Sequence, residues 1–589
     1  MATTAVLVGE PSVRGSSEAM RMMLLSFAAI GITIVWGVEL TYCTPYLLKL
    51  GLTKSNTSLI WIAGPLSGLV VQPVVGVVAD ENASRWGRRR PLMVGGAIIV
   101  AVSLLVLGFT REIVGWAGGG LGSTIGLAVL AIYVVDFALN VVQSCARSLV
   151  VDTLSLEQQQ TGAAWCAFSL LLLLLLLLLL LLLSHLPRLP FPLRLFAHHA
   201  RPGPGSRMAA IGHVIGYAAG SVDLVGLFGT ALGDAQFQQL TVMAAWALLA
   251  STALTCWAVT ERVLVLPVGA RRKSTLDVLR QVHRTLRRLK PRIQAICWAQ
   301  FWAWIGWFPF LFYSTTWVGE TYFRYDAPAE EAKGGDDGVG DMGRIGSVSL
   351  FIYSAITFVG AFVLPMLVRS PEDDRFTPRP SPVVARLLEL VGDRRPDLVT
   401  AWMCGHVVFA ASMVFAPLAT SFRFATVLMC LCALPWTMAT WAPSALLGVE
   451  VTRMSSAYRP LAGDMELRAV HAIHDDDDDD YDDDEAPPPP LPHLEAGTDA
   501  GPVAGKSSTA ELSGIYLGIL NIYTTMPQFV GAFIASIVFA ILEPGSADDS
   551  SKKPSEHRGS GPSAISVCLF IGALSAVVAA FATRKLKYL

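Results

Sequence analysis

Twelve apolar runs, each long enough to cross a lipid bilayer as a helix, are the feature that most restricts how this chain can fold. A membrane-spanning helix needs about 20 mainly apolar residues. The chain is 53% hydrophobic and only 15% charged, whereas soluble domains are about 25% charged. We therefore predict an all-α integral membrane protein with twelve spans, near residues 22–46, 58–79, 91–109, 123–151, 208–230, 237–259, 294–317, 347–368, 400–417, 424–447, 512–542 and 563–582.

Charged loops predict the orientation of these spans. The segment from Arg262 to Arg292 holds ten Lys or Arg residues and few acids, so the positive-inside rule places it in the cytoplasm. Counting spans puts the Arg85–Arg90 loop and the Arg584–Lys587 tail on the same side, and the acidic Glu320–Arg344 loop outside. Both termini are expected in the cytoplasm. The basic segment also separates six spans from six, as in transporters built from two pseudo-symmetric halves.

The predicted domain organisation follows from this division. It comprises a cytoplasmic tail (1–21), an N-terminal six-helix half (22–259), a cytoplasmic basic linker (260–293), a C-terminal six-helix half (294–583) and a cytoplasmic tail (584–589).

Two stretches within the halves do not follow the pattern of spans. Residues 166–205 contain fourteen consecutive leucines, but a thirteenth crossing would put the basic linker outside. We interpret them as a non-native insertion or gene-model artefact, with a re-entrant hairpin as the alternative. Residues 450–511 include six consecutive aspartates and a proline run, and we expect a disordered cytoplasmic loop. The loop lacks the spaced ligands and turn glycine of a calcium site, and we predict no metal site in the chain.

A polar stripe runs along the predicted fourth span. Asp136, Asn140, Gln143 and Arg147 are spaced i, i+4, i+7 and i+11, so they share one face of a helix. Charged residues inside a membrane are costly and usually face the bundle interior or a water-filled path. The stripe therefore predicts a transport pathway. The alternative for Arg147, which lies near the end of the span, is that its side chain reaches the lipid headgroups.

The loop between the second and third spans reads GVVADENASRWGRRRP, from Gly76 to Pro91. We expect Gly76 to permit a close helix contact and Asp80 to end its helix. Arg88, Arg89 and Arg90 would then pair with Asp80 as a gate that breaks during alternating access. The alternative is that the arginines only anchor the loop at the cytoplasmic face.

This loop resembles the inner-loop motif of the major facilitator superfamily, in the longer form ending in Gly-Arg-Arg-Arg-Pro that sucrose transporters carry. Further segments resemble the glycoside–pentoside–hexuronide:cation symporter branch, which includes fungal general α-glucoside permeases, plant sucrose transporters and animal solute carrier family 45 proteins. The resemblance covers essentially every span and departs from the family at 166–205 and in the length of the acidic loop. The segments that carry it are WGVELTYCTPYLLKLGL (36–52), DFALNVVQSCARSLVVD (136–152), AQFWAWIGWFPFLFYSTTWVGE (299–320), PWTMATWAPSALLG (435–448) and GIYLGILNIYTTMPQFVGAF (514–533).

Glu39, in the first span, is expected at a depth comparable with that of Asp136. Two carboxylates in a low-dielectric cavity favour the neutral acid, as a proton-coupling pair requires. The resemblance implies the same, because the family is proton-coupled and its fourth-span aspartate matches Asp136. Arg147 lies about 16 Å further along the helix and is expected to pair across helices instead. The alternative for Glu39 is a structural hydrogen bond to a neighbouring helix.

Candidate sugar-binding residues are Asn140 and Gln143 of the stripe and a further set in the C-terminal half. Gln300, Trp304 and Trp307 in the seventh span combine an amide with aromatic surfaces that suit the C–H faces of sugars. Trp302 and Tyr313 lie nearby, and the alternative is an aromatic belt or packing. In the eleventh span, polar residues share one face and would bind sugar hydroxyls or join helices together. These are Asn521, Thr524, Thr525 and Gln528.

Two prolines and a histidine also lie in the predicted spans. Pro435 and Pro443 are expected to break the tenth span, so that irregular backbone lines a cavity. His213 in the fifth span is either a proton relay or, as we favour, a satisfied core histidine.

The sequence as a whole predicts a proton-coupled symporter of sucrose or a maltose-type α-glucoside that works by alternating access. We expect no cofactor other than the proton, no nucleic-acid partner, and the plasma membrane as location, with the vacuolar membrane as the alternative. The rivals are a sugar sensor that does not translocate and a transporter of another small solute. The spans contain no nucleophile–base set or HExxH motif, so an enzyme is not predicted.

Overall fold

The computed structural model describes most of the chain. The described residues are 6–9, 11–80, 82–153, 204–265, 280, 283–327, 338–368, 395–456, 509–543 and 562–589. The leucine tract up to residue 203, the linker residues 266–279 and the acidic loop from 457 to 508 lie outside them, so our interpretations of these stretches stay predictions.

The N-terminal half consists of long helices and short helical pieces that join them. They are α1 (Glu18–Ser26), α2 (Ala28–Val38), a π-turn (Glu39–Cys43), α3 (Thr44–Lys49), α4 (Lys54–Ile60), α5 (Ala63–Asp80), α6 (Arg90–Gly108), α7 (Thr110–Trp116), α8 (Leu121–Thr153), α11 (Pro204–Ser221), α12 (Leu224–Phe228) and α13 (Gln236–Ala258).

The C-terminal half repeats this plan. Its helices are α15 (Pro291–Thr321), followed by a π-turn (Tyr322–Asp326), α16 (Gly338–Leu367), α18 (Leu398–Met413), a short 3₁₀ turn (Ala416–Leu418), α19 (Phe422–Leu431), α20 (Ala433–Ser456), α22 (Thr509–Leu542) and α23 (Ala564–Lys585).

The predicted all-α membrane fold is confirmed, with one boundary corrected. Among the described residues, eleven helical segments are long and apolar enough to cross a membrane. The span predicted at 208–230 corresponds to α11, which is less apolar and ends at Ser221. The prediction was wrong beyond that point, because Asp223 starts a separate helix by accepting a hydrogen bond from the Gly226 N–H at 3.1 Å.

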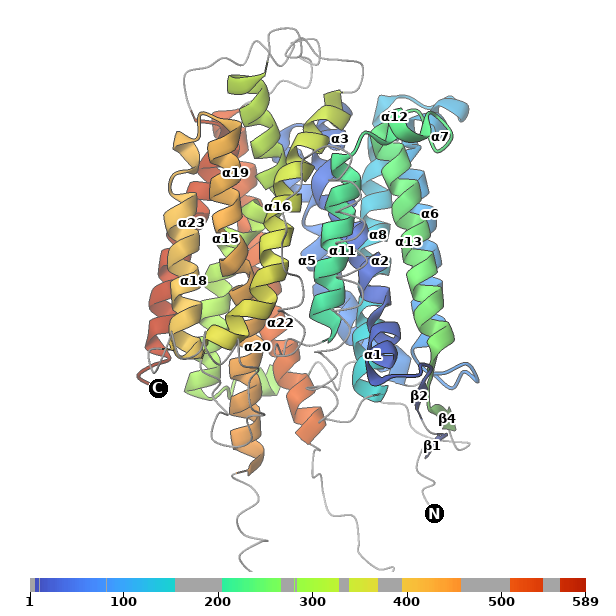
Figure 1. The fold of residues 1–589 in the computed structure, drawn as a ribbon, viewed down its shortest axis with the longest axis vertical. Helices are drawn as coiled ribbons and strands as arrows, with labels where there is room; N and C mark the ends of the chain where they lie inside the picture. Colours follow the sequence, from blue (N-terminus) through green and yellow to red (C-terminus); the bar gives the residue numbers. More distant parts are fainter. Residues whose placement is uncertain are drawn as a thin grey trace, which may run out of the picture.

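The long helices stand side by side along the long axis of the molecule (Figure 1). Helices α6 and α13 lie at one side and α18 and α23 at the other, while α11 packs against α16 where the two halves meet. Strand β1 (Val6–Val8) and the C-terminus lie towards one end of the bundle. We call this end the terminal face, and the end that carries α7 and α12 the opposite face.

The predicted tail of residues 1–21 is partly ordered, which the apolar pattern did not indicate. Strand β1 (Val6–Val8) pairs with β4 (Val263–Val265), and β2 (Ser12–Val13) pairs with β3 (Val259–Thr260), both antiparallel. Ser17 then caps α1 by accepting a hydrogen bond from the Met20 N–H at 3.2 Å. The start of the chain is thereby attached to the segment that follows α13.

Close approach of two glycines fixes α15 against α23. A Cβ added at Gly306 would lie 2.6 Å from the carbonyl oxygen of Gly572, which is much shorter than van der Waals contact. Small residues allow membrane helices to pack backbone against backbone, where dispersion contacts replace the hydrophobic driving force. The two glycines therefore set the spacing of these helices.

We expect Gly306→Ala to destabilise the protein by about 1–3 kcal/mol, because the added methyl group pushes α23 away from α15. Gly95→Ala on α6 is the matched control, since a Cβ there meets no atom within 4 Å and alanine has the better helix propensity. Thermal unfolding of the detergent-solubilised variants measures the difference. Equal melting temperatures for the two would contradict the close contact.

Candidate functional site

Glu39 begins a π-turn that interrupts the first span. The span is an α-helix up to Val38, forms the wider turn of a π-helix from Glu39 to Cys43, and continues as the α-helix α3. The Glu39 side chain is 2% exposed, and neither carboxylate oxygen has a hydrogen-bond partner in the described part of the chain. The alternative of a structural hydrogen bond is therefore not supported. Single π-turns within helices are frequent at functional sites.

Asp136 lies on α8 and is 1% exposed. Its carboxylate faces α5 at Gly64, where an added Cβ would lie 3.8 Å from Oδ1. The Oδ2 atom has no hydrogen-bond partner among the described residues. The turn that begins with Glu39 directly follows α2, and α2 packs against α8. Because burying a carboxylate without a partner is costly, these two acids are candidates for binding a proton.

The rest of the stripe leads from Asp136 towards the terminal face. Asn140 is buried and donates hydrogen bonds to Ser67 Oγ on α5 at 2.7 Å and to the Asp136 carbonyl at 3.0 Å. Gln143 is half-buried and Arg147 is exposed. The predicted pairing of Arg147 across helices is not found, since its guanidinium makes no ion pair within the described ranges. The stripe thus runs from the buried side chain of Asp136 to the exposed side chain of Arg147.

On α15, Gln300 and Trp304 carry unsatisfied polar atoms into the bundle. Gln300 Nε2 donates to Thr524 Oγ1 of α22 at 3.4 Å, while Gln300 Oε1 and Trp304 Nε1 are buried with no partner among the described residues. Such atoms suit a ligand that supplies hydroxyl groups. The Gln300–Thr524 contact joins the predicted groups of α15 and α22 into one set.

Trp307 does not present a free aromatic surface. It is 2% exposed, and its ring lies 4.4 Å from that of Phe409 and 5.0 Å from that of Trp436, measured between centroids. This geometry fits the packing alternative. The helical spacing of Trp304 and Trp307 could not show which of the two rings is available to a ligand. Both point inwards, and the side chains of neighbouring helices decide which ring is covered.

The polar residues of α22 bond mainly within their own helix. Thr525 Oγ1 donates to the Asn521 carbonyl at 2.8 Å, and Gln528 Nε2 donates to the Thr524 carbonyl at 3.1 Å. Asn521 and Gln528 are half-buried and Thr525 is buried. The amides of Asn521 and Gln528 remain candidates for contact with a sugar.

The predicted break in the tenth span is present, but only one proline accounts for it. The helix is interrupted at Cys432, between α19 and α20, and continues unbroken through Pro443. Pro435 lacks the N–H that would bind the carbonyl four residues earlier, which explains the interruption just before it. The prediction for Pro443 was wrong.

The three arginines of the inner-loop motif make their described bonds within their own half. Arg88 and Arg89 pair with Asp152 at the end of α8, at 3.1 and 3.2 Å. The carboxylate of Glu261 accepts hydrogen bonds from the backbone N–H groups of Arg88, Arg89 and Arg90, at 2.9, 2.8 and 2.9 Å. These contacts fit the anchoring alternative and hold the start of α6 against α8 and the end of α13.

Two other residues of the motif were predicted to act in the gate. A Cβ added at Gly76 would meet no atom within 4 Å, so the expected close helix contact is absent in this structure and that prediction was wrong. Asp80 ends α5 as predicted, but its side chain lies outside the described part. Its pairing with the arginines stays a prediction. Asp152 and Glu261 were not identified from sequence, because acids next to a basic loop are also expected on a solvated surface.

His213 on α11 stacks against Tyr217, with centroids 5.7 Å apart and planes 17° apart. Its Nδ1 atom is buried and has no hydrogen-bond partner among the described residues, so the satisfied core histidine that we favour from the sequence is not supported.

A groove of about 540 Å³ lies between α18 and α23 and is lined almost entirely by apolar residues such as Val407, Leu574 and Phe581. Neither the residues of the stripe nor His213 line this groove.

Known proteins resemble this chain along its length. A family model described as MFS/sugar transport protein matches residues 24–325. The general alpha-glucoside permease of Schizosaccharomyces pombe is 26% identical over 630 residues, covering 97% of this chain and 94% of that protein. The sucrose transport protein SUC4 of Arabidopsis thaliana is 27% identical over 374 residues, covering 58% of this chain and 63% of that protein.

Among solved structures, the nucleoside transporter NupG is similar in fold. It aligns with a TM-score of 0.50 at 12% identity, covering 96% of this chain and 99% of that one. At this identity the likeness concerns the fold alone.

Proposed function

This chain belongs to the MFS/sugar transport protein family, and we propose that it carries sucrose or a maltose-type α-glucoside across a membrane together with protons. Its family is one of transporters, not of enzymes. The names of its relatives, a general alpha-glucoside permease and a sucrose transport protein, support a disaccharide as the substrate.

The observation that carries the proton coupling is the pair of buried, unpaired carboxylates, Glu39 and Asp136. A charge in this environment is destabilised by desolvation and by the neighbouring charge, so a proton bound there is released only when the site changes its surroundings. If sugar binds next to a protonated Asp136 and is released after Asp136 loses its proton, the transport of sugar is coupled to the transport of protons. The Asn140 amide, which donates a hydrogen bond to Ser67 Oγ, is the next polar group after Asp136 along the proposed path.

Alternating access would arise from rocking of the two halves about α11 and α16. We infer that the terminal face is cytoplasmic, because the Arg88–Arg90 cluster and the basic C-terminal end of α23 lie there. The exposure of Arg147 on this side, below the buried Asp136, supports a state that is open to the cytoplasm. We place the protein in the plasma membrane, with the vacuolar membrane as the alternative.

Uptake of labelled sucrose and maltose in a transport-deficient host, with and without an imposed pH gradient, tests this function. The full chain and a version lacking residues 166–205 are compared, since that stretch is interpreted as an insertion. We expect gradient-dependent uptake by the shortened version. Surface-expressed protein that takes up neither sugar would overturn the proposed substrate and favour a sensor or another solute.

A further inference from the structure

Three charged side chains from three helices meet at the opposite face, and none of them belongs to the proposed proton or sugar site. Lys54 starts α4 in the N-terminal half, Glu320 lies near the end of α15, and Glu543 directly follows α22, both in the C-terminal half. The Lys54 Nζ atom lies 2.5 Å from Glu320 Oε1 and 2.8 Å from Glu543 Oε2. One ammonium group therefore connects two carboxylates across the boundary between the halves.

These side chains are largely shielded from solvent. Lys54, Glu320 and Glu543 are 19%, 23% and 26% exposed, whereas Arg344 and Asp223, which also pair between the halves, are 33% and 56% exposed. Exposed pairs contribute little, but removing one partner of a shielded pair leaves an uncompensated charge. Lys54, Glu320 and Glu543 are therefore expected to stabilise the contact between the halves more than Arg344 and Asp223 do.

Further contacts between the halves surround this cluster. Tyr313 donates its hydroxyl hydrogen to Ser58 Oγ at 2.8 Å, and the hydroxyls of Ser55 and Ser536 lie 2.9 Å apart. At the terminal face, the described ion pairs stay within one half, as with Arg292 and Glu450. Within the described part of the chain, the ion pairs and hydrogen bonds named here that cross between the halves therefore lie towards the opposite face.

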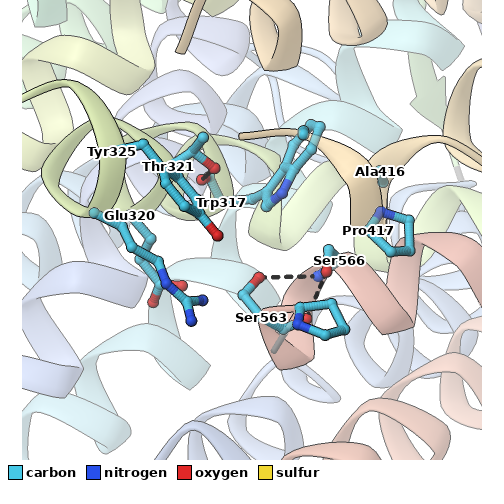
Figure 2. A pocket seen from close by; sticks show the side chains of 11 residues that line it. Trp317, Glu320, Thr321, Tyr325, Ala416, Pro417, Ser563 and Ser566 are labelled. Carbon is cyan, nitrogen blue, oxygen red and sulfur yellow. Dashed lines mark hydrogen bonds between the residues drawn. The ribbon is translucent and has the colours of Figure 1, made fainter. Parts of the chain in front are cut away.

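Glu320 also borders a small cavity on the side of the C-terminal half (Figure 2). Its volume is about 40 Å³, and its lining includes Thr321, Arg324, Tyr325 and Ser563. This is room for about three water molecules, each with several polar partners. Water there would keep the Glu320 carboxylate hydrated after it separates from Lys54, which lowers the cost of opening.

We propose that Lys54, Glu320 and Glu543 form a clasp that holds the opposite face closed and that breaks each time the protein opens towards that face. Lys54 moves with the N-terminal half, while both carboxylates remain with the C-terminal half. The clasp rests on the proposed alternating access, and it sets the balance between the two open states without touching sugar or the coupling carboxylates.

Thiol labelling from the opposite face tests the clasp. Ser58→Cys, in a background whose nine native cysteines are replaced, supplies a reporter that is buried while the face is closed. We expect Lys54→Gln to raise the labelling rate by a membrane-impermeant maleimide about tenfold, corresponding to a shift of about 1.4 kcal/mol in the equilibrium. Arg111→Gln is the matched control, because Arg111 is an exposed cation whose guanidinium bonds the Lys49 carbonyl at 3.3 Å within the same half.

Two further variants distinguish the clasp from general damage. Glu543→Gln should also raise labelling, whereas Lys54→Arg should keep the rate near that of the parent, because a guanidinium can still pair with both carboxylates. A Lys54→Gln rate equal to that of Arg111→Gln, or a Lys54→Arg rate as high as that of Lys54→Gln, would overturn the proposal. Labelling requires no sugar, so this result stands apart from failure of the proposed transport function.

Discussion

Asp136→Asn is expected to abolish accumulation of sugar against its gradient while leaving downhill movement of sugar in place. An asparagine at this position resembles the protonated acid in shape and charge but can neither bind nor release the coupled proton. The Asp136 carboxylate is buried next to Gly64, so the substitution fits the site without a new steric contact. An imposed pH gradient should then drive no net accumulation, and sugar should only equilibrate across the membrane.

Asp152→Asn is the matched control for this prediction. It is the same chemical change on the same helix, at a carboxylate that pairs with Arg88 and Arg89 instead of facing the interior. We expect this variant to retain gradient-driven accumulation at the level its surface expression allows. Accumulation by Asp136→Asn that is indistinguishable from the parent would rule out the coupling role of Asp136.

Glu261→Gln is expected to destabilise the fold by about 3 kcal/mol. The Glu261 side chain is only 4% exposed and lies 3.5 Å from the Arg90 guanidinium. It also accepts three backbone hydrogen bonds at the start of α6, where the N–H groups have no partners within the helix. A neutral amide keeps one acceptor oxygen but places an N–H₂ group against these donors and leaves Arg90 without its counter-charge.

Thermal unfolding of purified protein in detergent measures this effect. Glu112→Gln provides the control, because Glu112 is exposed and accepts a single hydrogen bond, from Gln238 Nε2 at 2.6 Å. We expect that change to cost less than about 1.5 kcal/mol. If both variants melt at the same temperature, the cap formed by Glu261 does not hold α6, α8 and α13 together as the contacts indicate.

Much of the site was predictable because polar residues are rare inside membrane spans. The spacing of Asp136, Asn140, Gln143 and Arg147 placed them on one helical face, and α8 presents them in this order from the interior to solvent. The clasp was not predicted from the sequence, because Lys54, Glu320 and Glu543 lie at the ends of their spans. Charges are ordinary at span ends, so nothing in the local sequence marks these three as partners.

The sequence alone determined that this chain crosses a membrane many times and which helix carries the polar stripe. Both follow from the cost of placing polar groups in hydrocarbon, which acts on each residue by itself and leaves a local pattern. Only the tertiary structure decided which partners the side chains meet: Glu261 on the start of α6, Trp307 covered by Phe409, and Lys54 between two glutamates. Such contacts join residues far apart in the chain, and their energies depend on distance and burial that no local pattern contains.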